Sequence, residues 1–518
     1  MELLQNWKPY DQNASASFFD AEWMFGVGDG FDIVIGNPPY VRMEQIKHLK
    51  EALESQYDCY TGRADLYVYF FERAYHLLKS KGILTYISSN KYFRSAYGEK
   101  LRNLLTTKTK LLQLIDFGDA DVFTAIAYPS IIIAQKEIVN KNQVRTLTWD
   151  AAQPIPDFPQ VFAANSFKIK QTELKPNGWQ LESSTILDLL AKLRKAGSPL
   201  GEYINNKIYM GIKTGLNDAF VIDKDTRNKL ITEHSSSSEV IKPFLRGRDI
   251  KKWFVDSPDL FIIFAKRGFD LEKYPAIKTH LEKYKADLSA RATIKTHPWY
   301  ELQQPQENIW REFENPKIIY PDIYEHQSFT VDKSGFYASN TCYFISTNEI
   351  WLCGVLNSQI IEWFYSMISN SIRGGYLRAF SDYMKQIPIP NAGEGDRAAI
   401  EKLVGYVLYL TEQLKNIPSH IATLDQSVTD KRMNLYFEQI IDALVMELYL
   451  PEELHEHDKY FMRYLFSENL PSLDTIKGDK MQTLRQIFER LFDKEHPIRH
   501  NLFLLNTIPV VRIIEGKS

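Results

Sequence analysis

The sequence is poor in cysteine, with only Cys59, Cys342 and Cys353, too few and too scattered for a disulfide framework or a Cys-x-x-Cys metal site. No apolar run approaches the roughly 18 residues of a membrane span, and residues 1–8 lack the pattern of a secretory signal. We therefore expect buried free thiols and a cytoplasmic protein. His455 and His457 form the one close histidine pair, and without further ligands at suitable spacing no metal site is predicted.

A strong net charge is also lacking, because 62 Lys and Arg residues face 65 Asp and Glu residues, which gives -3 at pH 7. This balance excludes a globally basic nucleic-acid binder, so any phosphate contact must come from local clusters. A chain of 518 residues with 44% hydrophobic content is long enough for two to four domains, each with its own core.

Strand-like and helix-like segments alternate in the first 150 residues. A short apolar strand stops at Gly36-Asn37-Pro38-Pro39, and an amphipathic helix with Asp65 as its N-cap runs to Lys79. The alternation indicates a parallel sheet of Rossmann type, whereas the short link before the final strand makes that strand antiparallel. The predicted strands are 31–35, 82–88, 111–117 and 130–135, and the second predicted helix is 97–107.

The pattern changes twice further along the chain. Prolines near residue 155 suit a linker, so we place the first domain at 1–150. Short β-like runs mixed with helices predict an α/β domain at 151–390, and a helical stripe predicts a helical region at 391–518. The runs expected as strands in the middle domain are 219–222, 260–264, 317–320 and 341–345.

The tetrapeptide Asn37-Pro38-Pro39-Tyr40 follows the carboxyl end of a predicted strand, where open α/β sheets bind ligands. The prolines stiffen the backbone, so that the Asn37 amide oxygen and the Pro38 carbonyl can accept hydrogen bonds from one amino group. Tyr40 adds an aromatic face for stacking a base. Taken alone, the tetrapeptide is also compatible with a plain strand-ending turn.

Residues 31–41 (FDIVIGNPPYV) resemble the catalytic motif of gamma-class, TaqI-type amino-methyltransferases, and specifically of adenine enzymes. The resemblance implies transfer of a methyl group from S-adenosylmethionine to adenine N6 in duplex DNA by base flipping, without a metal. It also implies that Leu66, Tyr67 and Phe70 line the cofactor pocket, although helix packing explains them equally well. Phe123, with Tyr128 as the alternative, matches the aromatic residue that packs against the flipped adenine.

Basic residues gather at two places that suit DNA. Lys91 and Arg94 follow the second predicted strand, on the same sheet edge as Asn37. Residues 241–253 interleave basic and aromatic side chains, and a solvated surface is the alternative for both places. The basic residues of the second cluster are Lys242, Arg246, Arg248, Lys251 and Lys252.

Segments 211–221, 315–322 and 356–390 resemble the TaqI-like specificity domain of Type IIG restriction-modification enzymes and related phage-defence methyltransferases. The resemblance implies that this region recognises the target sequence in double-stranded DNA. It also makes further residues candidates for DNA contacts: Lys213, Arg373, Tyr376 and Arg378.

The glycine-rich donor loop that this fold carries before the catalytic tetrapeptide is not evident in the 36 residues that precede Asn37. Residues 25–30 (FGVGDG) imitate such a loop, but a strand follows at once, so we expect a surface turn. We therefore expect either a fragment or one half of a split enzyme whose second chain supplies the donor-binding strands. The sheet edge left open predicts poor solubility or an obligate partner.

Other functions remain open on the sequence alone. The tetrapeptide also suits a protein glutamine-amide methyltransferase, although the long specificity-like region argues against it. A non-catalytic DNA-binding specificity subunit is the alternative from a different class. A nuclease associated with the whole assembly is a third possibility, yet no Asp-Glu-x-Lys constellation is evident in this chain.

Overall fold

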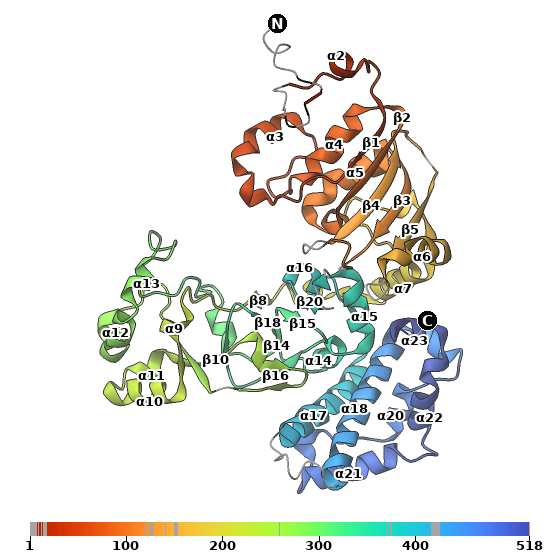
Figure 1. Ribbon diagram of the computed structural model, residues 1–518. Coiled ribbons are helices and arrows are strands. Elements are labelled where there is room, and N and C mark those ends of the chain that lie inside the picture. The colour runs from red at the N-terminus through yellow and green to blue at the C-terminus, as the bar shows by residue number, and fades with distance from the viewer. Residues whose placement is uncertain are drawn as a thin grey trace. The chain divides into compact units, whose positions relative to one another are not determined.

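The computed structural model describes residues 8–516 except 9, 12, 14–17, 119, 124–127, 140, 150–153, 258, 370, 373–375 and 416–424. The chain divides into two compact units, Met1–Asp188 and Leu189–Ser518 (Figure 1). Within the described residues, no helix is both long and apolar enough to span a membrane.

Unit 1 is an α/β fold around a six-stranded sheet (Figure 1). Its strands are β1 (Phe31–Gly36), β2 (Leu78–Ser89), β3 (Lys110–Asp116), β4 (Pro129–Gln135), β5 (Gln143–Thr148) and β6 (Phe167–Lys170). Its helices are α2 (Ala21–Phe25), α3 (Lys50–Gln56), α4 (Tyr67–Leu77), α5 (Glu99–Lys108) and α6 (Phe158–Asn165), and α7 (Ser184–Lys195) contains the division between the units.

The strands follow the order β1-β2-β4-β3-β5-β6. β1 pairs with β2 and β3 pairs with β5 in parallel, whereas β4 and β6 run antiparallel to their neighbours. The expected α/β sheet with an antiparallel strand is therefore confirmed. β4 lies inside the sheet rather than at its end, and β5 and β6 are additional strands. β6 and α6 lie past residue 150, where we expected the first domain to end.

The junction between α4 and β2 differs from the prediction. The helix ends at Leu77 and the strand starts at Leu78, where we expected a break around Lys81 and Gly82. Lys81 has a positive φ of 63°, and the pairing of β1 with β2 is irregular between Phe31 and Ile33. The strand accommodates this irregularity instead of ending there.

The two faces of the unit 1 sheet are covered unequally. The main core packs the sheet against α4 and α5, with Val34 of β1 at its margin. A smaller core on the side of Leu147 and Trp149 is covered by Phe158 and Phe162 of α6. Neither core contains Ile33 or Ile35, which alternate with Val34 and whose relative exposures are 61% and 77%. Within the described part of unit 1, β1 is therefore uncovered at Ile33 and Ile35, whereas Phe31 contacts Phe19 and Phe25.

Unit 2 begins with short strands and helices. Its strands are β7 (Gly197–Pro199), β8 (Ile208–Met210), β9 (Val221–Asp223), β10 (Ile241–Leu245), β11 (Ile250–Lys251), β12 (Phe254–Val255), β13 (Leu260–Ile263), β14 (Lys317–Pro321), β15 (Ile323–Tyr324), β16 (Thr330–Asp332), β17 (Tyr337–Ala338), β18 (Cys342–Ser346), β19 (Ser371–Ile372), β20 (Tyr376–Arg378) and β21 (Pro388–Pro390). Interspersed helices are α8 (Leu200–Tyr203), α9 (Asn217–Phe220), α10 (Lys224–Glu233), α11 (Ser237–Val240), α12 (Pro275–Glu282), α13 (Lys285–Ser289), α14 (Trp351–Leu356), α15 (Gln359–Ile368) and α16 (Ser381–Met384).

The strands of unit 2 form several small sheets, including β17-β10-β13-β9 and β16-β14-β18-β8. β14 is buried along its whole length because it lies between β16 and β18. Three of the four predicted strands are present, but Ala219 and Phe220 belong to α9, so the predicted strand at 219–222 starts late. Ala219 and Phe220 are buried in the core of unit 2, but they belong to a helical turn.

The chain after β21 is helical, as predicted. α17 and α18 pack against each other and against α14, which places this region in one compact unit with the mixed α/β region. The helices are α17 (Glu394–Lys415), α18 (Asp425–Tyr449), α19 (Pro451–His455), α20 (Met462–Ser467), α21 (Lys480–Leu491), α22 (Pro497–Leu504) and α23 (Pro509–Ile514).

Candidate functional site

The tetrapeptide Asn37-Pro38-Pro39-Tyr40 forms the loop directly after β1. Asn37 is exposed, Pro38 is buried and Tyr40 is half-buried. Since proline fixes φ, the buried Pro38 holds the backbone while the Asn37 side chain extends into solvent. The loop thus presents an amide at the carboxyl end of β1, where the sequence placed it.

Tyr40 packs against a cluster of tyrosines that includes Tyr67 and Tyr97. Its ring meets Tyr67 edge to face, with centroids 6.3 Å apart. The Tyr67 hydroxyl lies 2.9 Å from the Tyr97 hydroxyl. Burial raises the pKa of Tyr40 to about 12, so its phenol is neutral at physiological pH. The tyrosine cluster thus provides a neutral aromatic surface close to Asn37 in the same loop.

The segment after Tyr40 is fastened to the start of α4. The Leu66 amide donates to the Val41 carbonyl at 2.9 Å, and the Met43 amide donates to Asp65 Oδ1 at 3.3 Å. Asp65 was expected to cap α4, but the N-cap is Leu66, which makes no side-chain cap bond. Burial raises the pKa of Asp65, a residue that the sequence analysis did not assign to the site.

The three residues proposed to line a cofactor pocket differ in exposure. Tyr67 is fully buried and supports Tyr40, Leu66 is half-buried, and Phe70 has a relative exposure of 39%. Phe70 thus offers more accessible surface than Leu66 or Tyr67. Contact of these residues with a methyl donor stays a prediction.

The ends of β2 and β3 meet at a second cluster. Asn90 Nδ2 donates to Asp116 Oδ1 at 2.7 Å, and the Gly118 amide donates to the same oxygen at 2.9 Å. Lys91 is exposed next to Asn90, whereas Arg94 is half-buried. Burial raises the pKa of Glu182, and the positive charge of Arg94 opposes this rise. Sequence reasoning found Lys91 and Arg94 but missed the Asn90–Asp116 pair, although both of its members follow strand ends.

Phe123 is half-buried and directly precedes residues 124–127, which lie outside the described residues. Tyr128, the alternative aromatic, accepts a hydrogen bond at its carbonyl from the Asn90 amide at 2.7 Å. Tyr128 therefore lies next to the end of β2. The choice between the two aromatics stays a prediction.

Unit 2 contains an open cleft of about 880 Å³, which we call the recognition cleft. It is bounded by α9 and β9, by residues 246–251, by residues 321–328 and by residues 339–341. The loops approach closely: a Cβ on Gly211 would lie 2.0 Å from the Ser339 carbonyl oxygen, and one on Gly247 would lie 2.5 Å from the Thr341 carbonyl oxygen. Glycine is required at both positions for this packing.

The basic cluster at 241–253 is largely neutralised by carboxylates of unit 2. Arg246 forms two bonds to Asp249, at 3.0 and 2.9 Å. Lys242 lies 3.6 Å from Glu314, and Lys252 lies 3.0 Å from Glu438 of α18. Arg248 and Lys251 are exposed in the recognition cleft, and neither forms an ion pair with another described residue. The structure thus separates two accessible cations from three paired ones.

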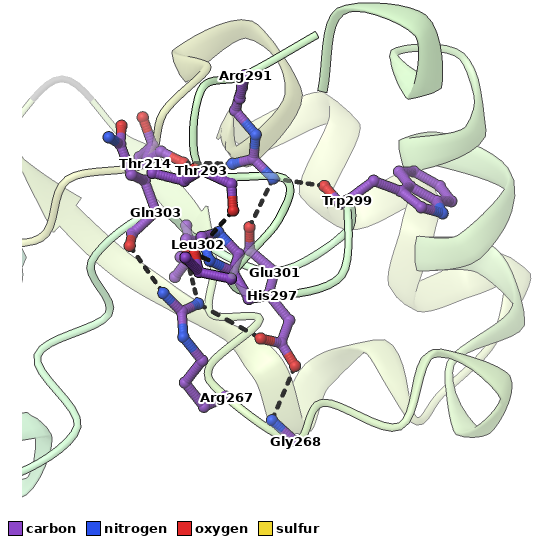
Figure 2. Close-up of polar contacts among 11 residues, drawn as sticks. Thr214, Arg267, Gly268, Arg291, Thr293, His297, Trp299, Glu301, Leu302 and Gln303 are labelled. Atoms are coloured by element: carbon purple, nitrogen blue, oxygen red, sulfur yellow. Dashed lines mark hydrogen bonds and ion pairs between the residues drawn. The ribbon is translucent and has the colours of Figure 1, made fainter. Parts of the chain in front are cut away.

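Lys213 lies on the loop 211–217, which is held by arginines bonded to backbone carbonyls (Figure 2). Arg291 donates to the carbonyls of Leu288, Thr214, Trp299 and Glu301 at 2.9, 3.2, 2.6 and 2.9 Å, and Arg267 donates to those of Leu302 and Gln303. Lys213 and Gln304 exchange backbone hydrogen bonds of 3.1 and 2.8 Å. The loop is thereby fixed while the Lys213 side chain remains exposed.

The remaining candidates lie elsewhere in unit 2. Tyr376 has a relative exposure of 41%, and the Arg378 guanidinium lies 5.2 Å from the centre of the Phe380 ring. Arg373 lies outside the described residues. His455 Nε2 is 2.8 Å from Glu447 Oε1, so this histidine is hydrogen-bonded to a carboxylate. The three cysteines are buried and free, as expected.

Two family models match the chain in this order. Residues 2–123 match the Eco57I restriction-modification methylase, and residues 242–389 match the TaqI-like C-terminal specificity domain. These matches cover the Asn37 loop and most of the recognition cleft, respectively. Two regions of the chain are thus similar to a restriction-modification methylase and to a specificity domain, in the order that its resemblance to TaqI-type enzymes predicted.

The curated relatives are Type II methyltransferases. The chain is 28% identical to Type II methyltransferase M.PaeR7I of Pseudomonas aeruginosa, over 70% of this chain and 64% of the relative. It is 25% identical to Type II methyltransferase M.BstVI of Geobacillus stearothermophilus, over 77% of this chain and 74% of the relative. The chain therefore spans about two thirds to three quarters of these proteins.

The fold also resembles a solved structure, that of the Type IIL restriction-modification enzyme MmeI in complex with DNA. The TM-score is 0.54 at 13% identity, over 89% of this chain and 57% of the MmeI chain. At this identity the likeness concerns the fold alone.

Proposed function

We propose that the chain provides the base-binding loop and the target-recognition region of a restriction-modification or phage-defence DNA methyltransferase that methylates adenine N6. The observation that carries the proposal is the loop after β1, where an exposed Asn37 amide stands next to a buried Pro38 and a half-buried Tyr40. S-adenosylmethionine would supply an electrophilic methyl group. The chain's own residues bind and orient the amino group that receives it.

In this proposal, Asn37 Oδ1 and the Pro38 carbonyl accept the two hydrogens of the adenine amino group. This orientation directs the nitrogen lone pair out of the ring plane, toward the donor methyl group. Both acceptors are pre-positioned, so they stabilise the positive charge that develops on the nitrogen with little reorganisation. The amino proton then leaves to solvent.

The target base must leave the duplex to reach Asn37, which costs a few kcal/mol. Stacking on Tyr40 offsets part of that cost, since a base on an aromatic face is worth about 1 to 3 kcal/mol. Tyr67, whose hydroxyl lies within hydrogen-bond distance of Tyr97, packs against the Tyr40 ring. Phe123 is assigned to the opposite side of the base, and the exposed Lys91 to the DNA backbone.

The uncovered part of β1 fits a further segment that completes the donor site. Exposed Ile33 and Ile35 form an apolar strip on a sheet edge, and Phe70 of α4 is also exposed. Natural sheets rarely leave such edges open. The residues present thus fit one side of a donor pocket, and strands from a second chain or another segment would pair with β1 and supply the rest.

Labelled methyl transfer tests the proposal. The full chain, paired with a donor-binding methyltransferase segment, should label duplex DNA, and nucleoside analysis should identify N6-methyladenine. Asn37→Ala should lower the rate by about 100-fold or more, as expected for loss of a pre-positioned polar group. Asn103→Ala is the matched control, because Asn103 is an exposed asparagine on α5.

Two results would contradict the assignment. An unchanged rate in Asn37→Ala would remove the loop from the site, and N4-methylcytosine as the product would overturn the choice of adenine. Sequence-specific DNA binding without any transfer would instead favour the non-catalytic specificity subunit. Labelling of a protein glutamine in place of DNA would favour the amide methyltransferase.

A further inference from the structure

The recognition cleft in unit 2 is charge-balanced rather than basic. The exposed cations Arg248 and Lys251 share it with the carboxylates of Asp218, Asp322 and Glu325. The three carboxylates offset the cations, so the cleft as a whole does not strongly attract phosphate groups. Carboxylates can, however, accept hydrogen bonds from the amino groups of cytosine, and Asn or Arg side chains form bidentate pairs with adenine or guanine edges. The chemistry of the cleft therefore suits base edges.

Arg248 is presented to this cleft from a rigid turn. The Gly247 amide donates to Thr341 Oγ1 at 2.9 Å. On the other side, Asp249 accepts the Arg246 backbone amide at 2.8 Å as well as both guanidinium bonds of Arg246. The backbone of Arg248 is thus held from both sides, while its side chain is exposed. A fixed planar donor pair is the geometry that a bidentate contact requires.

We infer that Arg248 is a specificity-determining residue that reads a guanine edge from the recognition cleft. Lys251, at the rim of the same cleft, contacts the DNA backbone, and Arg246 is a positioning residue for Arg248. The inference rests on the proposed target-recognition function and adds the base class and the residue. It also separates three neighbouring basic residues into three roles, which their sequence alone does not distinguish.

A binding selection tests the assignment on the full chain, without any need for methyl transfer. A pool of duplexes with a randomised core is incubated with the protein, and the bound fraction is sequenced. Arg248→Ala and Arg248→Lys should each lose the preference for G·C at one position, by roughly 5- to 100-fold, and keep the other positions. Arg248→Lys retains the charge but not the planar donor pair, so it isolates bidentate reading.

Lys251→Ala is the contrasting control. It should weaken binding evenly across sequences and reduce the slope of log affinity against log salt by about one. Asp249→Asn, which weakens the hold on Arg246, should broaden the same position that Arg248→Ala affects. The melting temperatures of the Arg248 and Lys251 variants should be unchanged, since both residues are exposed, which shows that the fold is intact.

The inference is wrong if Arg248→Ala leaves every position of the selected motif unchanged, or if it lowers affinity evenly as a phosphate contact would. A wild-type chain that enriches no sequence would overturn target recognition and the role of Arg248 together. A wild-type chain that enriches a motif but fails the transfer assay would contradict only the catalytic part of the proposed function.

Discussion

The two units hold their candidate functional loops by different means. In unit 1, the Asn37 loop is stiffened by proline, backed by tyrosines and tied by backbone bonds to the start of α4, beside a strand that is uncovered at Ile33 and Ile35. In unit 2, Arg291 holds the loop 211–217 through the Thr214 carbonyl, and Asp249 holds Arg246 at the recognition cleft. Unit 1 thus joins a proline-stiffened loop to a strand with exposed isoleucines, whereas hydrogen bonds and ion pairs of arginines hold the loops of unit 2.

The two units differ in whether they need a further surface to cover exposed apolar side chains. Exposed isoleucines on β1 require a covering surface, while the paired charges of unit 2 require none. We therefore expect DNA recognition to be autonomous and methyl transfer to depend on a further segment. Each of the following predictions tests a part of this contrast.

The largest effect is expected from matched substitutions in the two sheets. Ile318→Glu places a carboxylate in fully covered β14 and should destabilise unit 2 by about 4 kcal/mol or more, since an unpaired buried charge is among the most costly changes. Ile33→Glu on β1 should change the stability of the isolated chain by no more than about 0.5 kcal/mol. Denaturant unfolding with far-ultraviolet circular dichroism measures both.

The substitution Ile33→Glu also tests whether a donor-binding segment binds to β1. Ile33→Glu should improve the solubility of the isolated chain but abolish complementation by a donor-binding segment, while sequence-specific DNA binding persists. A large loss of stability in Ile33→Glu would show that this part of β1 is already covered within the chain. Unchanged complementation would place the contact of that segment elsewhere.

The sequence predicted the first four strands of the unit 1 sheet, because hydrophobic runs and breakers have local causes, but it did not predict β5 and β6. Phe31–Gly36 and Pro129–Gln135 are each a short apolar run next to proline, and both were found. The place of β4 between β2 and β3 was not predicted, because strand order depends on contacts between distant segments. Ala219 and Phe220 show the limit of periodicity, since a short apolar run fits a helical turn as well as a strand.

The candidate site also contains residues that the sequence could predict and residues whose availability depends on the fold. The position of Asn37 and Tyr40 after β1 was predictable because both lie in one contiguous motif that follows an apolar run. The roles of the basic residues at 241–253 were not, since Lys252 is neutralised by Glu438 from a helix nearly 200 residues away in sequence, and Lys242 by Glu314. Composition indicates that cations are present, but only the fold decides which of them remain available.

A smaller effect should come from the arginine that holds the loop 211–217 in unit 2 (Figure 2). Arg291→Met keeps much of the side-chain length but removes four bonds to carbonyls. Hydrogen exchange at the Lys213 and Gln304 amides should accelerate by about 10- to 100-fold, equivalent to roughly 1 to 3 kcal/mol of local stability. DNA affinity should fall several-fold as Lys213 loses its fixed position.

Lys295→Met is the control for the lost positive charge, because Lys295 is exposed on the same connection between α13 and β14. It should leave exchange at Lys213 unchanged. Equal exchange rates in Arg291→Met and the wild type would mean that the loop is held by its backbone pairing alone. The loops of the two units would then be held by similar means, and the contrast between them would weaken.

The smallest effect is a pH dependence that belongs to unit 2. Burial raises the pKa of Asp442 to about 6, despite the opposing charge of Lys252, while Glu438 and Glu362 add to the rise. The folded state therefore holds this proton more tightly than the unfolded state, so the stabilisation that protonation gives is full below about pH 4 and is lost as the pH rises to about 6.

Asp442→Asn stays neutral and can still accept the Gln359 amide, which lies 3.0 Å from Asp442 Oδ1. It should raise the free energy of unfolding by about 1 to 2 kcal/mol at pH 7 and by almost nothing at pH 4. Denaturant unfolding of both proteins at the two pH values measures this difference, and a stabilisation of the same size at pH 4 would assign the effect to packing instead of to the charge.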